Sequence, residues 1–344
     1  MKKKTIVLSS LLILVFIVGI VIFREKNSAP QGASTATLTT DQTAAAQNLV
    51  KSTNFKGNAT IYKDGQKVWE STTANTATSA YLINSIQKVF TAGLVMQQVD
   101  QGKLALNTKV AQFYPQIPNA GNETIMNLLE MTSGYTSSDP IMGTVPYQND
   151  DVNGEDLAKK IKFDQTKFGQ WNYQDVNYAL LSHIIEKTSG QSYENLFNGM
   201  YTAPLGLKHT GFMWADDQTK QKIQLAQPTT NVDMNAVHGL LGAGSVAMSN
   251  EDLFLASRAL LNGKLLSNDS RVAIYGTGNN QVHYRGGFYD KGNYYYCNGG
   301  GYNYSSFLRI SKDGKNAVIL QTNMGGNFGQ ISNQANQLYE KLFE

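Results

Sequence analysis

Cysteine is nearly absent from this chain, since Cys297 is the only one among 344 residues. An intrachain disulfide is therefore excluded, and stability must come from core packing alone. Neither sign of charge is in large excess, since the net charge is only +3 and no basic stripe follows the N-terminus. This argues against a nucleic-acid-binding protein. A hydrophobic fraction of 41% and a charged fraction of 16% are typical of a globular protein rather than a disordered one.

One long apolar run is present near the N-terminus. Residues 5–23 read TIVLSSLLILVFIVGIVIF, contain no charge and follow three lysines in residues 1–4. The run is long enough to cross a bilayer core about 30 Å thick, and it exceeds the apolar stretch of about 7–15 residues of a cleaved signal peptide. The alternative of cleavage is disfavoured because Pro30 follows the only weak cleavage site. We therefore expect a single-pass anchor in the cell membrane, with residues 1–4 in the cytoplasm and the remainder extracellular.

The composition changes after the apolar run. Residues 24–46 are rich in Ser, Thr, Ala and Gln, which predicts a flexible linker before a domain over residues 47–344. In that domain, β-prone runs flank Lys-Asp-Gly turns at 63–65 and 312–314, and helical spacing dominates about 107–228. We predict an α/β fold of the α+β type. An antiparallel sheet built from both chain ends is flanked by helices, and a mostly helical lobe is inserted into it.

The stretch YLINSIQKVF places Ser85 and Lys88 three residues apart at the start of an expected helix. Residues at this spacing share one helix face, so the hydroxyl and the amine can meet. A serine hydroxyl needs a neighbouring base to act as a nucleophile, and the helix N-terminus favours a developing oxyanion. The alternative is a chance S-x-x-K string. The position at a strand-to-helix junction favours the catalytic interpretation.

Tyr173 and Asp175 lie two apart in a polar, aromatic loop just before another expected helix. Tyr173 is a candidate for relaying a proton between the nucleophile and the leaving group. The alternative is a capping loop, with Asp175 as the helix N-cap and Tyr173 as a packing residue.

The segment YCNGGGY places three successive glycines after Cys297 and Asn298 at the edge of an expected strand. Such a run suggests a backbone that a ligand approaches closely, or a glycine bulge without a ligand. The four histidines offer no Ser-His-Asp triad at recognisable spacing, and there is no G-x-S-x-G motif. His183 is interpreted as a packing or surface residue. No cluster has zinc-ligand spacing, so neither a metal nor a cofactor is expected.

Over about residues 50–344 the chain resembles the serine β-lactamase-related hydrolases of the class C type, which include penicillin-binding proteins and related esterases. Ser85 and Lys88 match the S-x-x-K motif of this family, and Tyr173-Gln174-Asp175 with VNYALLSHIIE matches its Y-x-N loop and helix. ETIMNLLEMTSG, PLGLKHTGF and LLGAGSVAMSNEDLFLASRALLNG also match in order. The resemblance implies a β-lactamase/penicillin-binding-protein-like fold, with Ser85, Lys88 and Tyr173 as the catalytic residues.

Two departures from the family pattern bear on the substrate. Asp175 replaces the usual Asn, and a carboxylate beside Lys88 raises the pKa of the lysine. Either the proton then passes through Tyr173, or Asp175 serves only to position Lys88. The third motif, K-T-G or H-x-G, is missing. Either Cys297 or Asn298 stands at the position of its cation, followed by the glycines Gly299 and Gly300. Without that cation, binding of a substrate's terminal carboxylate is weakened.

The resemblance therefore implies an active-site serine hydrolase that acts on D-alanyl groups of the cell envelope. The expected substrate is a D-alanyl ester of teichoic acid, whose amine Asp175 would receive. Two alternatives remain at this point: a D-alanyl-D-alanine carboxypeptidase acting on peptidoglycan, and a catalytically silent module that binds the cell wall. The expected substrate-binding residues are Asp175, Cys297, Asn298, Gly299 and Gly300.

Overall fold

The computed structural model describes residues 36–137, 147–275 and 282–344. The predicted anchor at 5–23 and most of the predicted linker lie outside these ranges. Within them, no helix combines the length and the apolar character that crossing a membrane requires. The expected location in the cell membrane is therefore corrected, because the described structure contains no membrane-spanning helix.

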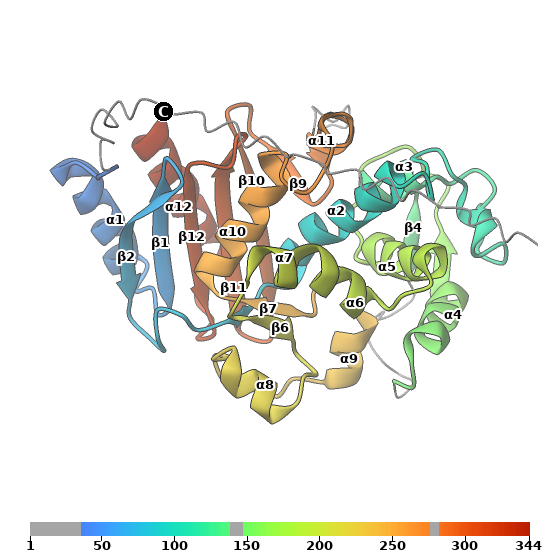
Figure 1. Ribbon diagram of the computed structural model, residues 1–344, viewed down its shortest axis with the longest axis horizontal. Coiled ribbons are helices and arrows are strands. Elements are labelled where there is room, and N and C mark those ends of the chain that lie inside the picture. Colours follow the sequence, from blue (N-terminus) through green and yellow to red (C-terminus); the bar gives the residue numbers. More distant parts are fainter. Residues whose placement is uncertain (1–35, 138–146, 276–281) are drawn as a thin grey trace, which may run out of the picture. The chain divides into compact units, whose positions relative to one another are not determined.

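Seven strands of the described residues form one sheet, in the spatial order β2-β1-β12-β11-β10-β9-β8, and every neighbouring pair is antiparallel (Figure 1). The strands come from both ends of the chain: β1 (Asn58–Lys63), β2 (Gln66–Thr72), β8 (Tyr284–Arg285), β9 (Phe288–Asp290), β10 (Tyr294–Gly301), β11 (Tyr304–Ser311) and β12 (Ala317–Thr322). This confirms the predicted fold class.

The two Lys-Asp-Gly turns explain the hairpins. Asp64 and Gly65 have φ values of 51° and 79°, the left-handed conformation that a tight turn between β1 and β2 requires. Gly314, with φ of 73°, does the same between β11 and β12. These local signals fix the pairing of β1 with β2 and of β11 with β12.

One face of the sheet is covered by the two terminal helices, α1 (Thr40–Ser52) and α12 (Phe328–Phe343). Ile331, Ala335, Leu338 and Leu342 follow helical spacing and form the buried stripe of α12. Residues 40–46, which the sequence places in the linker, form the start of α1 instead. The reason is a capping box, in which Thr39 Oγ1 accepts from the Gln42 N–H and Gln42 Oε1 accepts from the Thr39 N–H.

Helix α10 (Asn250–Leu261) packs against β1 and β12 in front of the sheet (Figure 1). Helix α2 (Gln87–Asp100) is buried on nearly every side, because it lies among α10, α11 (Asn268–Tyr275) and α5 (Val176–Ser189). A helix that is apolar all round belongs in a core, which fits the sequence VFTAGLVM. The helix therefore provides a rigid support for residues at its N-terminus.

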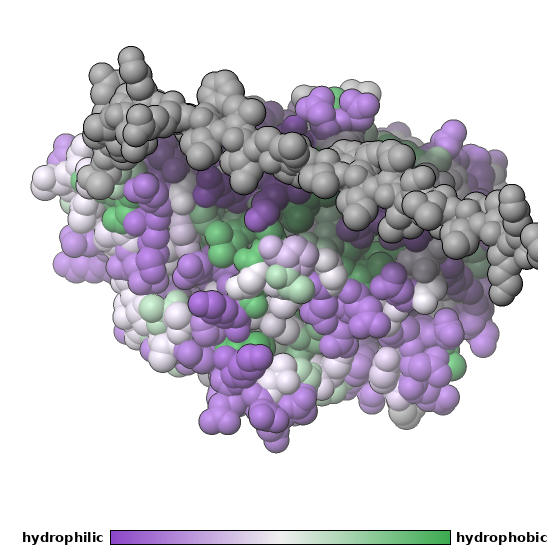
Figure 2. Space-filling view, viewed as in Figure 1, coloured by the Kyte–Doolittle hydropathy of each residue, from purple (hydrophilic) through white to green (hydrophobic). Residues whose placement is uncertain are grey.

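The chain between β2 and β8 holds the remaining helices and two small sheets. One small sheet contains β3 (Tyr81–Leu82), β7 (Val246–Met248) and β6 (Thr210–Phe212), and the other contains β4 (Tyr135–Ser137) and β5 (Ile161–Phe163). The helices are α3 (Ile125–Leu129), α4 (Asp150–Lys160), α6 (Tyr193–Phe197), α7 (Ala203–Leu205), α8 (Asp217–Lys222) and α9 (Met234–Gly239). Hydrophilic residues gather over α8 at the bottom of the view in Figure 2. The inserted segment thus has its own solvent-facing surface.

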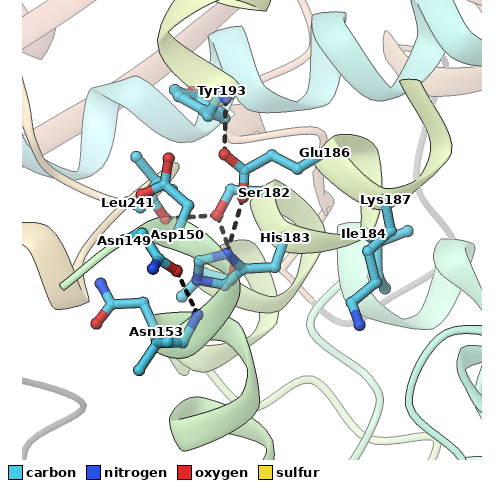
Figure 3. A network of polar contacts seen from close by, with 12 residues as sticks. Asn149, Asp150, Asn153, Ser182, His183, Ile184, Glu186, Lys187, Tyr193 and Leu241 are labelled. Carbon is cyan, nitrogen blue, oxygen red and sulfur yellow. Dashed lines mark hydrogen bonds and ion pairs between the residues drawn. The ribbon is translucent and has the colours of Figure 1, made fainter. Parts of the chain in front are cut away.

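A buried polar network joins α4, α5 and α6 (Figure 3). His183 Nδ1 lies 3.0 Å from Glu186 Oε2, and Glu186 Oε1 accepts from the Tyr193 N–H at 2.7 Å. Burial, and then the neighbouring Glu186 carboxylate, raise the pKa of Asp150 at the start of α4. His183 is only 4% exposed. His183 is therefore a packed residue of this network and does not lie in the cleft described below.

Candidate active site

Ser85 lies in a short 3₁₀ turn, η1 (Asn84–Ile86), between β3 and α2. Asn84 adopts a positive φ of 47°, which is uncommon for a residue other than glycine and often marks a functional site. The Asn84 amide donates to the Leu82 carbonyl at 3.3 Å. Ser85 is half-buried although both of its neighbours are buried, so the turn presents the Ser85 side chain at the N-terminus of α2.

Lys88 lies one turn further along, and its side chain is 1% exposed. Its Nζ donates to Ser85 Oγ at 3.0 Å and to the Ala243 carbonyl at 3.0 Å. The same atom forms an ion pair with Asp175 Oδ1 at 2.7 Å. An ammonium group at this position therefore has two hydrogen-bond acceptors and one anionic partner.

The charge of Lys88 follows from two opposing effects. Burial alone would lower its pKa, because it disfavours the charged form. The Asp175 carboxylate and the Tyr173 hydroxyl oppose this effect, and the net result is that the pKa of Lys88 is raised above its ordinary value. Lys88 is therefore an ammonium at neutral pH.

Asp175 occupies the N-cap position of α5, but its side chain makes no capping hydrogen bond. The carboxylate is instead directed to Lys88, and the Asp175 side chain is 36% exposed. The capping alternative considered from the sequence is thus not what the geometry shows. Tyr173 lies nearby, with the centre of its ring 5.2 Å from Lys88 Nζ.

A cleft of about 540 Å³ opens above Ser85. Its lining residues are Ser85, Tyr173, Tyr284, Gly287, Tyr289, Tyr296, Cys297, Asn298, Gly300 and Phe328. Five of these were predicted from the sequence as site residues, whereas the predicted residues Lys88, Asp175 and Gly299 lie outside the lining. The aromatic side chains of this lining that the sequence analysis missed are Tyr284, Tyr289, Tyr296 and Phe328, which together form the aromatic wall of the cleft. Nothing in the sequence pattern separates these tyrosines from the many buried ones.

The glycines of β10 serve packing as well as access. A Cβ on Gly299 would lie 2.0 Å from the Ile83 carbonyl oxygen, so only glycine lets β10 pass so close to the Ser85 turn. Gly300 is exposed and faces the cleft. Gly299 is therefore required by the close approach of two backbone segments, whereas Gly300 is the glycine that a ligand in the cleft can reach.

We expect Gly299→Ala to destabilise the domain by about 1–3 kcal/mol and to lower activity, because β10 must move away from the Ser85 turn. Thermal unfolding and the rate of ester hydrolysis measure the two effects. Gly121→Ala is the matched control, since a Cβ at Gly121 has no atom within 4 Å. Equal stability and activity of the two variants would show that the close approach does not constrain the site.

Asn298 and Cys297 do not supply a cation to the cleft. Asn298 Oδ1 accepts from Arg309 at 2.6 Å, and its Nδ2 donates to Ser332 Oγ at 3.0 Å. Burial raises the pKa of the Cys297 thiol, which is 2% exposed and therefore neutral. Asn298 thus presents a neutral amide at the edge of the cleft.

Arg309 on β11 is a buried cation that the sequence analysis did not identify. It is fully buried, and burial lowers its pKa to about 10, so it is still charged at neutral pH. Its acceptors include Asn298, Asn336 and Ser332, and no carboxylate in the described ranges forms an ion pair with it. The only signal was a charged residue in the apolar strand YSSFLRIS. Among the described residues, no three His, Cys, Asp or Glu side chains are placed to hold a metal.

Comparison with protein families gives a match that spans most of the chain. The Beta-lactamase family model matches residues 43–339. Among curated proteins, penicillin-binding protein PbpX of Bacillus subtilis is 29% identical over 318 residues, covering 87% of this chain and 79% of that protein. The teichoic acid D-alanine hydrolase of Staphylococcus aureus is 27% identical over 300 residues, covering 81% of this chain and 72% of the relative.

Solved structures share the fold. FmtA from Staphylococcus aureus superposes with a TM-score of 0.75 at 23% identity, covering 88% of this chain and 90% of that one. A D-amino acid amidase from Ochrobactrum anthropi gives a TM-score of 0.72 at 17% identity, covering 87% and 98%. With the family model matched over most of its length and hydrolases among its relatives, this chain belongs to the Beta-lactamase family and is a serine hydrolase.

Proposed function

We propose that this hydrolase removes D-alanyl groups from the cell envelope through an acyl-enzyme on Ser85, and that its substrate is a D-alanyl ester of teichoic acid. The observation that carries the proposal is the 3.0 Å contact between Lys88 Nζ and Ser85 Oγ below an open cleft. A nucleophile and an oriented charge partner at hydrogen-bond distance are what covalent catalysis requires. This intact pair argues against a silent wall-binding module.

The charge state of Lys88 assigns the proton-transfer steps. Because Lys88 is an ammonium, it donates to Ser85 Oγ and stabilises negative charge there instead of accepting the serine proton. The Tyr173 hydroxyl, whose ring centre lies 5.2 Å from Lys88 Nζ, relays that proton. It accepts the Ser85 proton as Ser85 Oγ bonds to the acyl carbon, and it passes its own O–H proton to the leaving alcohol oxygen as the ester C–O bond breaks. Water hydrolyses the acyl-enzyme by the reverse transfers.

The carbonyl oxygen of the substrate gains negative charge during both steps. Ser85 lies in the turn directly before α2, at the positive end of the helix dipole. The Ile86 and Gln87 N–H groups already donate to carbonyls of that turn, so the dipole is what favours an oxyanion at this position. We assign oxyanion stabilisation to the Ser85 end of α2.

The neutral edge of the cleft favours an ester substrate. A D-Ala-D-Ala terminus carries a carboxylate that needs a charge-assisted hydrogen bond. Here Asn298 offers only a neutral amide, and Arg309 is too buried to contact a substrate. A D-alanyl ester has no such carboxylate. Since Asp175 Oδ1 is engaged by Lys88, recognition of the substrate amine by Asp175 stays a prediction.

Incubation of the full chain with D-alanylated teichoic acid and, separately, with a muropeptide ending in D-Ala-D-Ala tests the proposal. We expect D-alanine to be released from the teichoic acid, and intact mass to show a transient D-alanyl adduct. Ser85→Ala is the control and should show neither. Release from the muropeptide alone would replace the esterase by a carboxypeptidase, and no adduct from either substrate would refute the acyl-enzyme.

A further inference from the structure

A second cleft adjoins the one above Ser85. It has a volume of about 770 Å³ and shares two lining residues, Tyr289 and Tyr296, with the active-site cleft. The two rings stack with their centres 4.8 Å apart and 18° between their planes. A ligand in the active-site cleft can therefore continue across this pair of rings into the second cleft.

The second cleft differs from the first in its charge. Lys291 and Lys312 line it, and both side chains are exposed, whereas the lining of the active-site cleft contains no charged residue. Asp290 pairs with Lys312 at 2.9 Å, so one positive charge remains in excess among these three residues. Exposed lysines beside a groove attract anions through their field and bind phosphate oxygens as point charges.

Tyr296 lies between cations on the boundary of the two clefts. Lys291 Nζ is 5.5 Å from the centre of its ring, and the Arg309 guanidinium carbon is 5.3 Å from it. No carboxylate in the described ranges neutralises Arg309 by an ion pair, so its charge adds to the positive potential at this wall. The aromatic wall and the lysines form one continuous surface that leads away from Ser85.

We propose that this second cleft is a subsite for backbone phosphates of the polymer whose D-alanyl ester lies at Ser85. The proposal rests on the proposed function, and it names the substrate class more closely as an anionic poly(alditol phosphate). Lys291 and Lys312 bind phosphates of neighbouring repeats, while the alditol packs against Tyr289 and Tyr296. The subsite explains how a cleft without a carboxylate-binding cation gains affinity for a charged polymer.

Kinetics on two substrates test the subsite in the full chain. The polymer is D-alanylated poly(glycerol phosphate). The short substrate is an ester of D-alanine with a small alcohol that carries no charge, and it does not extend beyond the first cleft. In the double variant Lys291→Glu/Lys312→Glu, we expect the ratio of kcat/KM for the polymer to that for the small ester to fall about tenfold or more. Added salt should reduce this ratio in the wild type as well.

A variant that increases the positive charge of the second cleft separates the effect of charge from that of structural damage. Asp290→Asn frees the charge of Lys312, and the new amide oxygen can still accept from the Gly292 N–H, which Asp290 Oδ1 does at 2.7 Å. We expect the polymer ratio to rise about two- to fivefold. Lys103→Glu/Lys264→Glu replaces two exposed lysines that line neither cleft, so it is the charge-matched control and should leave the ratio unchanged. A fall in Asp290→Asn, or equal effects of Lys103→Glu/Lys264→Glu and Lys291→Glu/Lys312→Glu, would overturn the subsite.

Binding without catalysis distinguishes failure of the subsite from failure of the proposed function. The probe is poly(glycerol phosphate) stripped of D-alanine, titrated into Ser85→Ala. Binding that weakens at least tenfold with Lys291→Glu/Lys312→Glu supports the subsite even when the wild type releases no D-alanine from the polymer. Release of D-alanine that is insensitive to the lysine variants would keep the esterase and refute the subsite.

Discussion

Lys88→Met is expected to lower kcat for ester hydrolysis by about a thousandfold, at the upper end of the range for loss of one donor to a developing negative charge. Methionine fills a similar volume but cannot donate to Ser85 Oγ, which now receives a hydrogen bond at 3.0 Å. It also leaves the Ala243 carbonyl without its donor. Stopped assays with a chromogenic D-alanyl ester measure the loss, and intact mass after treatment with a fluorophosphonate measures acylation of Ser85.

The control for this variant is Lys109→Met, an exposed lysine that donates to the Asn122 carbonyl outside the cleft. It should keep wild-type activity. Thermal unfolding must show that Lys88→Met is folded, which is expected because the freed Asp175 side chain is partly exposed and can be hydrated. A folded Lys88→Met that keeps a tenth or more of the wild-type rate would remove Lys88 from the mechanism.

The elements that the sequence predicted best are those specified by local signals. The Lys-Asp-Gly turns predicted both hairpins because left-handed turn residues act within four positions of the chain. The spacing of Ser85 and Lys88 predicted their contact for the same reason, since a helix fixes neighbours one turn apart. Both inferences needed no knowledge of what packs around them.

The features that the sequence left open depend on contacts between distant segments. Whether Asp175 caps α5 or pairs with Lys88 is decided by packing of α5 against α2, across 87 positions of the chain. Gly299 looked like a ligand contact, and only the nearby Ile83 carbonyl shows why it must be glycine. Arg309 gave no functional signal, because its partner Asn298 lies on the neighbouring strand. Residues 40–46 were assigned to a linker because their small, polar composition concealed a capping box.

Asp175→Asn is expected to move the alkaline limb of the pH–rate profile to lower pH. The variant removes the carboxylate that favours the ammonium form of the buried Lys88. In the wild type, Asp175 and Tyr173 keep the pKa of Lys88 raised, so the ammonium persists through the accessible pH range. In the variant, burial dominates and lowers the Lys88 pKa. A rate that requires the ammonium is then lost as the pH rises.

The same variant decides between two roles for the lysine. If Lys88 acts as an ammonium that stabilises the Ser85 oxygen, the rate of Asp175→Asn relative to the wild type falls by about tenfold or more as the pH rises, because the variant loses the ammonium at a lower pH. If Lys88 instead accepts the serine proton, lowering its pKa makes it a better base, and Asp175→Asn gains activity at neutral pH. Rates corrected with Ser85→Ala for spontaneous ester hydrolysis separate these outcomes. A gain at neutral pH would transfer the role of base from Tyr173 to Lys88, and Asp175 would then restrain the enzyme instead of activating it.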